Sequence, residues 1–267
     1  ALALVATDGV LFTFSRTAMP NIHLVCFTLA AAMAAYRFWI GPVQRRRWLV
    51  ACGAALGAGI ATKWTIAPLA LGLAVATAGR IVHDAWRLRT AGSHGRMWIG
   101  DAVAWLVSFA VVPLAIYFAA YLPYFAAGHD LGDFARLQRE MWTFHHHMPD
   151  HYMGSSPWYT WPFARPVPFL DGVTDGGRSI VEISCRGNPL LWWMFVPALV
   201  ASAVRFVRRR RPADALVVCG FCAAWLPWAF VDRYGFAYYL APAVPFGAIA
   251  VAHLLDDVRR LAPRAGG

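Results

Sequence analysis

The chain has 267 residues, of which 59% are hydrophobic and only 14% are charged, and its net charge is +10. Soluble domains carry about 25% charged residues, so this composition excludes a disordered chain and argues against a soluble globular domain. It predicts an all-α polytopic membrane protein, because a chain of this length has room for several spans of about 20 apolar residues each.

Apolar runs predict seven membrane helices, at residues 21–40, 48–63, 66–82, 97–121, 189–206, 214–230 and 236–255. The runs at 48–63 and 66–82 are short, so these helices are expected to be either tilted or the two arms of a tight hairpin. Residues 1–7 look like the end of an eighth helix. Because the chain starts with Ala1 rather than Met and opens inside an apolar run, we expect an N-terminally truncated fragment.

The helices divide the chain into N-terminal membrane helices at 1–121, a long loop at 122–188 and C-terminal membrane helices at 189–267. The loop is too long to be only a connector, and such loops are usually either functional or disordered. This loop is rich in Trp, Tyr, His and Pro. Its composition therefore favours an ordered, functional loop over a disordered one.

Clusters of arginine predict the orientation of the helices. If the seven helices alternate in direction, every cluster falls on one side of the membrane, and the positive-inside rule makes that side cytoplasmic. The loop at 122–188 is then extracytoplasmic. The positive charge reflects topology and contact with anionic lipids, not nucleic acid, because the arginines do not form one groove. The clusters are Arg45–Arg47; Arg80, Arg87, Arg89 and Arg96; Arg208–Arg211; and Arg259, Arg260 and Arg264.

Three basic residues on the outer side are candidates for binding an anion. Lys63 is the only lysine in the chain and lies between two apolar helices, Arg16 precedes the helix at 21–40, and Arg233 lies between the last two helices. A charge at the bilayer centre costs about 2.5–3.5 kcal/mol on insertion scales, so its retention suggests a use. The use we predict is holding a lipid-linked phosphate at the outer surface. The alternatives are snorkelling to headgroups or an ion pair such as Asp232 with Arg233.

The loop contains a run of histidines within residues 140–151. A divalent metal at His145, His147 and His151 is one interpretation, since His147 and His151 are four residues apart. Pro149 between them argues against a continuous helix, so we predict no metal or other cofactor. The other interpretations are that the histidines hydrogen-bond a phosphate or an acceptor hydroxyl, or are part of the loop structure.

An aromatic and proline-rich segment follows at residues 155–162. Aromatic rings stack on sugar faces, but they are also standard residues of the membrane interface, and physical reasoning alone favours the interfacial interpretation. General acid–base catalysis needs a carboxylate or histidine beside the reacting hydroxyl. None of the outer-side carboxylates has a spacing that singles it out as a base.

Short motifs occur in a fixed order along nearly the whole chain, and the ordered set resembles the bacterial branch of the protein O-mannosyltransferase family, within the C-type membrane glycosyltransferases. The motifs are Asp8-Gly9 with Ser15-Arg16-Thr17-Ala18; Gly57-x-Gly59-Ile60-Ala61-Thr62-Lys63-Trp64; Gln138-x-x-Met141-x-x-x-His145; Ser155-Ser156-x-Trp158-x-x-Trp161-Pro162; Gly187-Asn188-Pro189-x-x-x-Trp193; Trp225-x-Pro227-Trp228; Arg233; and Pro245-Phe246.

The resemblance implies a bacterial plasma-membrane enzyme that transfers a sugar, typically mannose, from a polyprenyl-phosphate donor. The acceptor would be a Ser or Thr hydroxyl of an exported protein, with inversion at the anomeric carbon. Fixed cations would stabilise the charge developing on the leaving phosphate, and the long loop would cover the sugar and the acceptor and exclude water. The residues implied are Arg16, Lys63, Arg233 and His146 for the phosphate, and His145, Ser155, Ser156, Trp158 and Trp161 for the sugar and acceptor.

The chain departs from the family pattern in three places. The family has its catalytic Asp-Glu pair in the first external loop, which would precede Ala1, so the catalytic base is unknown and the fragment is expected to be inactive alone. The Asp that usually follows the Ser-Arg motif is replaced by Pro20-Asn21. The family's His-Pro-Tyr is replaced by residues 151–154, so acceptor or donor choice is expected to differ.

Three other functions remain open from the sequence. The first is a glycosyltransferase that acts on a lipid or polysaccharide instead of a protein. The second is a membrane transporter, which would need polar residues along a path at mid-membrane and often inverted repeats; we find neither a charge near a span centre nor a repeat. The third is a non-catalytic membrane scaffold.

Overall fold

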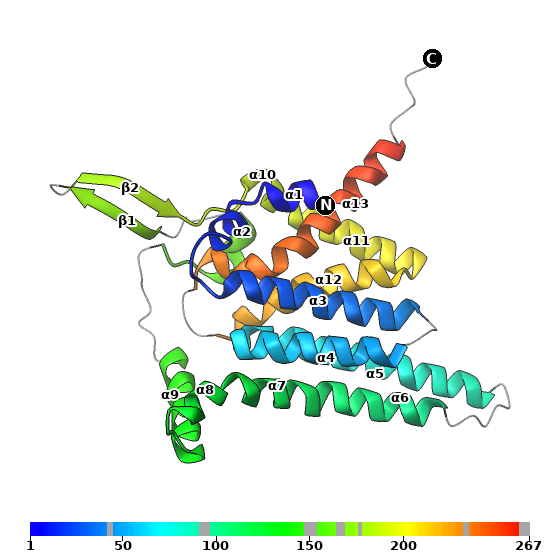
Figure 1. Cartoon of the computed structure of the whole chain (residues 1–267). Helices are drawn as coiled ribbons and strands as arrows, with labels where there is room; N and C mark the ends of the chain where they lie inside the picture. The colour runs from blue at the N-terminus through cyan, green and yellow to red at the C-terminus, as the bar shows by residue number, and fades with distance from the viewer. Residues whose placement is uncertain are drawn as a thin grey trace.

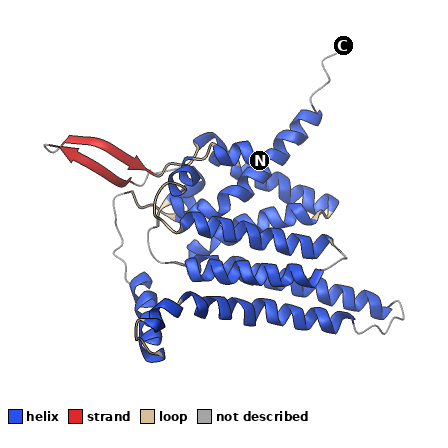
Figure 2. Ribbon diagram, in the orientation of Figure 1, coloured by secondary structure: helices blue, strands red, loops and turns tan. Residues whose placement is uncertain are grey.

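Long helices packed side by side make up most of the protein, as the computed structural model shows (Figures 1 and 2). The structure describes residues 1–41, 45–90, 97–146, 154–163, 169–175, 178–231 and 235–261. A two-stranded hairpin projects from one end of the bundle, and the helix α9 runs across that end instead of along it (Figure 1).

The first half of the chain supplies helices α1 to α9, with 3₁₀ geometry at Trp64–Ile66 and a π-helical turn at Val107–Val111. The helices are α1 Leu2–Ala6, α2 Gly9–Phe14, α3 Asn21–Ile40, α4 Arg45–Thr62, α5 Ala67–Thr90, α6 Met97–Leu106, α7 Val112–Ala120, α8 Leu122–Ala126 and α9 Leu131–His146.

The second half begins with a 3₁₀ segment at Trp158–Phe163 and a small antiparallel sheet, and ends with four more helices. Further 3₁₀ segments lie at Leu226–Phe230 and Ala237–Ala243. The elements are β1 Phe169–Asp175, β2 Arg178–Ser184, α10 Pro189–Trp193, α11 Phe195–Arg209, α12 Pro212–Trp225 and α13 Val244–Leu261.

All seven predicted apolar runs are helical, and in the described residues six helices are long and apolar enough to cross a membrane. These six are Asn21–Ile40, Trp64–Thr90, Trp98–Ala120, Pro189–Arg209, Pro212–Phe230 and Ala237–Leu261. The remaining run forms α4, which is rich in glycine and begins with three arginines, so it has no comparable apolar window. It nevertheless packs between α3 and α7 inside the bundle.

Glycines of α4 allow this close packing. A Cβ atom on Gly53 would overlap the backbone of Ser108 in the π-helical turn, and one on Gly57 would meet Pro113. Small residues four apart let two membrane helices approach closely, because backbone atoms can then touch directly. Of the two short runs, 48–63 thus forms α4, packed against α3 and α7, and 66–82 extends to Thr90 as the longer helix α5.

The hairpin β1–β2 was not predicted, and it adds a small sheet to a chain expected to be all-α. Val173 pairs with Val181 and Gly172 with Glu182 in antiparallel register. The sequence does carry the signal, because β-branched residues flank the dipeptide Gly176-Gly177, a typical two-residue hairpin turn sequence. This signal is weaker than that of the apolar runs of the membrane helices, so the hairpin was missed.

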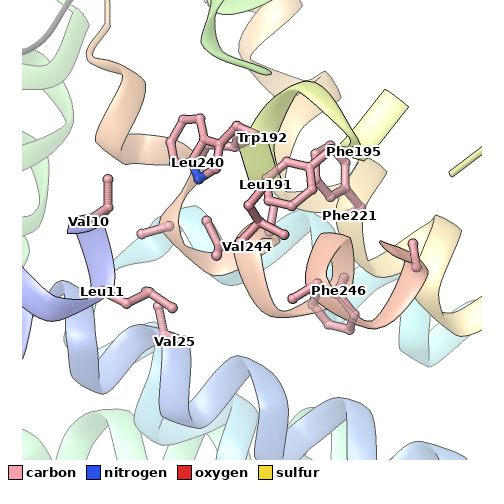
Figure 3. Close-up of a cluster of buried hydrophobic side chains, with 14 of the residues drawn as sticks. Val10, Leu11, Val25, Leu191, Trp192, Phe195, Phe221, Leu240, Val244 and Phe246 are labelled. Carbon is pink, nitrogen blue, oxygen red and sulfur yellow. The ribbon is translucent and has the colours of Figure 1, made fainter. Parts of the chain in front are cut away.

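The two halves of the chain share one packed interior. Helix α12 contacts both α3 and α5, and the cluster in Figure 3 joins side chains of α2, α3 and α10 to α13. Phe195 and Phe221 lie edge to face with ring centres 5.4 Å apart. Burial of large apolar side chains here fixes α2 and α10 against the membrane helices.

Two ion-pair networks that join different helices lie at one end of the bundle, where α3, α5 and α11 finish (Figure 1); we call it the arginine end. Arg45 bonds Asp84 at 2.8 Å and Asp101 at 3.0 Å, joining α4, α5 and α6. Arg205 bonds Asp214 at 3.0 Å and Asp257 at 2.6 Å, joining α11, α12 and α13. The opposite end, which carries Lys63, is called the lysine end below.

Candidate functional site

Lys63 lies in the turn between α4 and the 3₁₀ segment Trp64–Ile66. Its backbone is extended, with φ −164° and ψ 129°, and the 3₁₀ segment begins at the next residue, Trp64. Nζ of Lys63 donates to Oδ1 of Asn21 at 3.2 Å and lies 4.8 Å from the ring centre of Tyr239. The chain's single lysine thus joins the start of α3 to the segment before α13.

A narrow pocket opens beside this lysine. Its lining includes Asn21, Lys63, Thr65, Trp228 and Tyr239, and its volume of about 10 Å³ holds roughly one water-sized group. Asn21 is only 4% exposed. Among the described residues its Nδ2 has no hydrogen-bond partner. Leaving a buried polar group unpaired costs about 1–3 kcal/mol, so an oxygen atom of a ligand or of water that reached this amide would be stabilised by it.

Aromatic side chains form one wall of the pocket. Trp228 stacks on Tyr239 with ring centres 4.7 Å apart. Trp161, from the long loop, lies edge-on to both rings at 5.5 and 5.9 Å and is only 1% exposed. A ring buried to this extent supports the wall from behind and offers no open face to a sugar.

The segment with the predicted residues Ser155, Ser156 and Trp158 is joined to the C-terminal part of the chain by hydrogen bonds. The N–H of Ser156 donates to the carbonyl of Gly235 at 2.8 Å, and Nε1 of Trp225 donates to the carbonyl of Trp158 at 2.9 Å. Ser156 is buried, whereas Ser155 and Trp158 are half-buried. The structure thus brings Ser155, Ser156 and Trp158 to the lysine end, and their contact with sugar or acceptor stays a prediction.

Arg16 follows the last turn of α2, at the same end of the bundle as Lys63. Its guanidinium lies 4.5 Å from the ring centre of Phe12, and the residue is exposed. Two residues earlier, Phe14 packs edge-on against Tyr238 with ring centres 5.6 Å apart, and Tyr238 lines the pocket. Arg16 is therefore beside the pocket but does not line it.

Asp8 is the carboxylate that the structure singles out and the sequence did not. It is fully buried, and it caps α2 by accepting from the N–H of Leu11 at 3.0 Å. Its Oδ2 accepts from Nε1 of Trp192 at 2.7 Å and from the N–H of Asn188 at 3.3 Å. Burial raises the pKa of the Asp8 carboxyl above its ordinary value, although these hydrogen bonds oppose the shift. Asp8 thus holds α2 against α10.

A hydrogen-bond chain on the other side of the turn was also missed. Nε1 of Trp64 donates to the hydroxyl of Tyr117 at 3.0 Å, and this hydroxyl donates to Oε1 of Gln138 at 2.6 Å. The chain connects the residue after Lys63 to α9 of the long loop. Gln138 stood in a family-like motif, but no local pattern could show which residues it contacts.

The other predicted residues cannot be placed. Arg233, His147 and His151 lie outside the described residues, and His145 and His146 end α9 without described side chains. In the part of the chain that the structure describes, no three His, Cys, Asp or Glu side chains are grouped to hold a metal. The metal alternative at the histidine run therefore stays untested.

The helices and the pocket define a multi-pass membrane protein with a lysine-containing pocket at one end of the bundle. The chain belongs to the protein O-mannosyltransferase family, which confirms the resemblance found in its motifs. Residues 130–265 match the family model of the C-terminal four TMM region of protein-O-mannosyltransferase. Residues 1–127 match the model of dolichyl-phosphate-mannose-protein mannosyltransferase.

Curated relatives show the same similarity. The polyprenol-phosphate-mannose–protein mannosyltransferase of Mycobacterium tuberculosis is 28% identical over 96% of this chain and 59% of its own length. The protein of that name from Mycolicibacterium smegmatis is 29% identical over 96% of this chain and 60% of its own length. The chain thus spans about three fifths of these relatives. No solved structure matches the chain.

Proposed function

We propose that the protein transfers mannose from a polyprenyl-phosphate-mannose donor to Ser or Thr hydroxyls of exported proteins. The observation that carries this proposal is the pocket lined by Lys63 and Asn21, in which Lys63 bonds the amide oxygen of Asn21 and the buried Nδ2 of the same amide has no partner among the described residues. Its lining combines a cation and an amide donor, as a phosphate oxygen requires. The names of the relatives supply the class of donor and acceptor.

The pocket suits a reaction in which phosphate is the leaving group. When the bond between the anomeric carbon and the phosphate oxygen breaks, its electron pair stays on that oxygen. The Lys63 ammonium and the Asn21 amide would stabilise this charge, which is greater in the transition state than in the bound donor. Tyr239 holds the ammonium in place through its ring face.

The acceptor hydroxyl attacks the anomeric carbon from the face opposite the phosphate, which inverts its configuration. Its proton must pass to a base, and the described lining of the pocket contains no carboxylate. The aromatic wall of Trp161, Trp228 and Tyr239 would keep water from competing with the hydroxyl. We also propose as phosphate ligands Arg16, which lies beside the pocket, Arg233 and His146.

The proposed orientation places the arginine end in the cytoplasm. Arginines cluster at that end, at the start of α4 and in the last turns of α5 and α11, as the positive-inside rule predicts for the cytoplasmic side. The pocket and the loop at 122–188 would then face the outside of the plasma membrane, where exported proteins emerge. The same loop would cover the acceptor during transfer.

The test is mannose transfer by membranes that contain the full-length protein, with radiolabelled polyprenyl-phosphate-mannose and an acceptor peptide. Lys63→Met should lower transfer by about 10²–10³-fold, the usual effect of removing one group that stabilises transition-state charge. The matched control is Arg136→Met, which removes an exposed cation and should leave transfer unchanged. Normal transfer by Lys63→Met, at normal expression, would overturn the proposal.

Two further readouts separate the alternatives. Label that appears in lipid or polysaccharide but not in peptide would show a different acceptor with the same donor chemistry. Uptake of a solute into proteoliposomes without any lipid-linked sugar would show a transporter. Either result would contradict the proposed protein acceptor.

A further inference from the structure

Helix α9 carries more apolar surface than its contacts within the protein cover. Phe134 packs against Tyr121 and Phe118, with ring centres 4.9 and 5.2 Å away, and Met141 accepts from the Tyr121 hydroxyl at 3.9 Å. These contacts involve the middle of the apolar face. On its flanks three large apolar side chains remain more than half exposed, namely Leu131, Trp142 and Phe144.

The opposite face of α9 is polar. Arg136 and Arg139 are exposed there together with Glu140, and Arg136 bonds Asp133 at 2.7 Å. Apolar and polar residues therefore occupy separate sides of one helix. Such a helix is stable where one side meets an apolar phase and the other meets water.

The position of α9 identifies that apolar phase. The helix crosses the end of the bundle beside α7 and α8 (Figure 1). Only 11% of the most apolar window of the span Trp98–Ala120 is buried inside the protein, so in a bilayer most of this span would be exposed to lipid. Exposed apolar side chains continue along this span and into α8, namely Val111, Leu114, Phe118 and Leu122. Because Phe118 contacts Phe134, the lipid-facing surface of α7 leads directly to α9.

We propose that α9 is an interfacial helix that lies in the plane of the bilayer surface at the lysine end. Trp142, Phe144 and Leu131 enter the boundary between headgroups and acyl chains, and Arg136, Arg139 and Glu140 face water. Tryptophan favours that boundary because its ring is apolar and its N–H is polar, and Phe and Leu are the usual apolar residues of interfacial helices. The partner of this face is the lipid surface itself.

This placement also sets the depth of the pocket. Trp64, Tyr117 and Gln138 form a continuous hydrogen-bond chain from the Lys63 turn to α9. If α9 lies among the headgroups, Lys63 lies near their level, where the phosphate of a lipid-linked donor would be. Only this consequence rests on the proposed function. The placement of α9 in the bilayer surface does not depend on any transfer reaction.

Photocrosslinking of the full-length protein in lipid nanodiscs tests the placement. The photoreactive residue p-benzoylphenylalanine replaces Trp142 or Phe144 on the apolar flanks, and Arg136 or Arg139 on the polar face. Leu114 on α7 provides the lipid-facing reference. After illumination, mass spectrometry measures the fraction of protein that carries a phospholipid adduct. We expect adducts at positions 142 and 144 at a level close to that at 114, and few at 136 and 139.

Two results would overturn the inference. Adducts at 142 and 144 as rare as those at 136 would place the flanks in water. Crosslinks from 142 and 144 to a second polypeptide, in place of lipid, would show a protein partner. The two flank positions are independent, so a variant that fails to fold at one still leaves the other. The lipid adducts are measured independently of mannose transfer, so a failure of the proposed function would leave this readout unchanged.

Discussion

The indole N–H of Trp192 donates to Oδ2 of Asp8 at 2.7 Å, although the two residues are 184 positions apart in the sequence. Both side chains are fully buried. This bond joins the start of α2 to α10, the first of the C-terminal helices. Arg16 follows the end of α2. The lysine end is therefore built from both halves of the chain.

The buried carboxyl of Asp8 predicts a pH dependence of stability. Its pKa in the folded protein is raised, chiefly by burial, whereas in the unfolded chain it is about 3.9. The stability contributed by protonated Asp8 is fully present below that value and is lost as pH rises through the raised pKa. The melting temperature of the native protein minus that of Asp8→Asn should therefore fall over this window and stay constant above it.

This difference is measured by thermal unfolding in one detergent over a series of pH values. All other titrating groups are common to both proteins and cancel. A difference that grows with rising pH would show instead a lowered pKa and would contradict the role of burial.

Close packing of α4 predicts opposite effects for two glycines. A Cβ at Gly53 would overlap the backbone of Ser108, so Gly53→Ala should lower the stability by about 1–3 kcal/mol, the usual cost of overpacking. Gly72 in α5 has no atom within 4 Å of such a Cβ, so Gly72→Ala should leave the melting temperature unchanged or raise it slightly. Equal melting temperatures for the two variants would show that α4 and the π-helical turn Val107–Val111 separate easily.

The sequence predicted the membrane helices because an apolar run of about 20 residues is stable as a helix within the apolar core of a bilayer. It also pointed to Lys63, because a lone lysine between apolar runs is costly. It could not predict the partners of Lys63, since the contacts with Asn21 and Tyr239 arise only when α3, α4 and the segment before α13 pack together. Trp161 shows the same limit, because its aromatic character favoured an interfacial position over a sugar platform, whereas the structure buries it behind the wall of the pocket.

The buried ion pairs at the arginine end predict a large loss of stability when one partner is removed. Arg205 is 11% exposed and Asp214 is 3% exposed. Arg205→Met leaves the Asp214 carboxylate buried without this partner, which should cost about 3–5 kcal/mol. The matched control is Arg260→Met, since Arg260 pairs with Asp256 on an exposed surface and such pairs contribute only about 0–1 kcal/mol.

Chemical denaturation in detergent micelles compares these two variants. The double variant Arg205→Met with Asp214→Asn should recover part of the lost stability, because it removes the buried charge as well. No recovery would mean that packing of the arginine stem, and not the unpaired carboxylate, causes the loss.

Tyr239 allows the contact with the Lys63 ammonium to be separated from simple packing. Nζ lies 4.8 Å from its ring centre, and a cation over an aromatic face gains about 0.5–2 kcal/mol. Tyr239→Phe keeps the ring and should keep the KM for the polyprenyl-phosphate donor near the native value. Tyr239→Leu removes the ring and should raise this KM by roughly 2- to 30-fold, the range to which that energy corresponds. Initial rates of mannose transfer at varied donor concentration measure both values. A variant Tyr239→Leu with native KM, or a variant Tyr239→Phe as impaired as Tyr239→Leu, would show that the ring does not position the lysine for the donor.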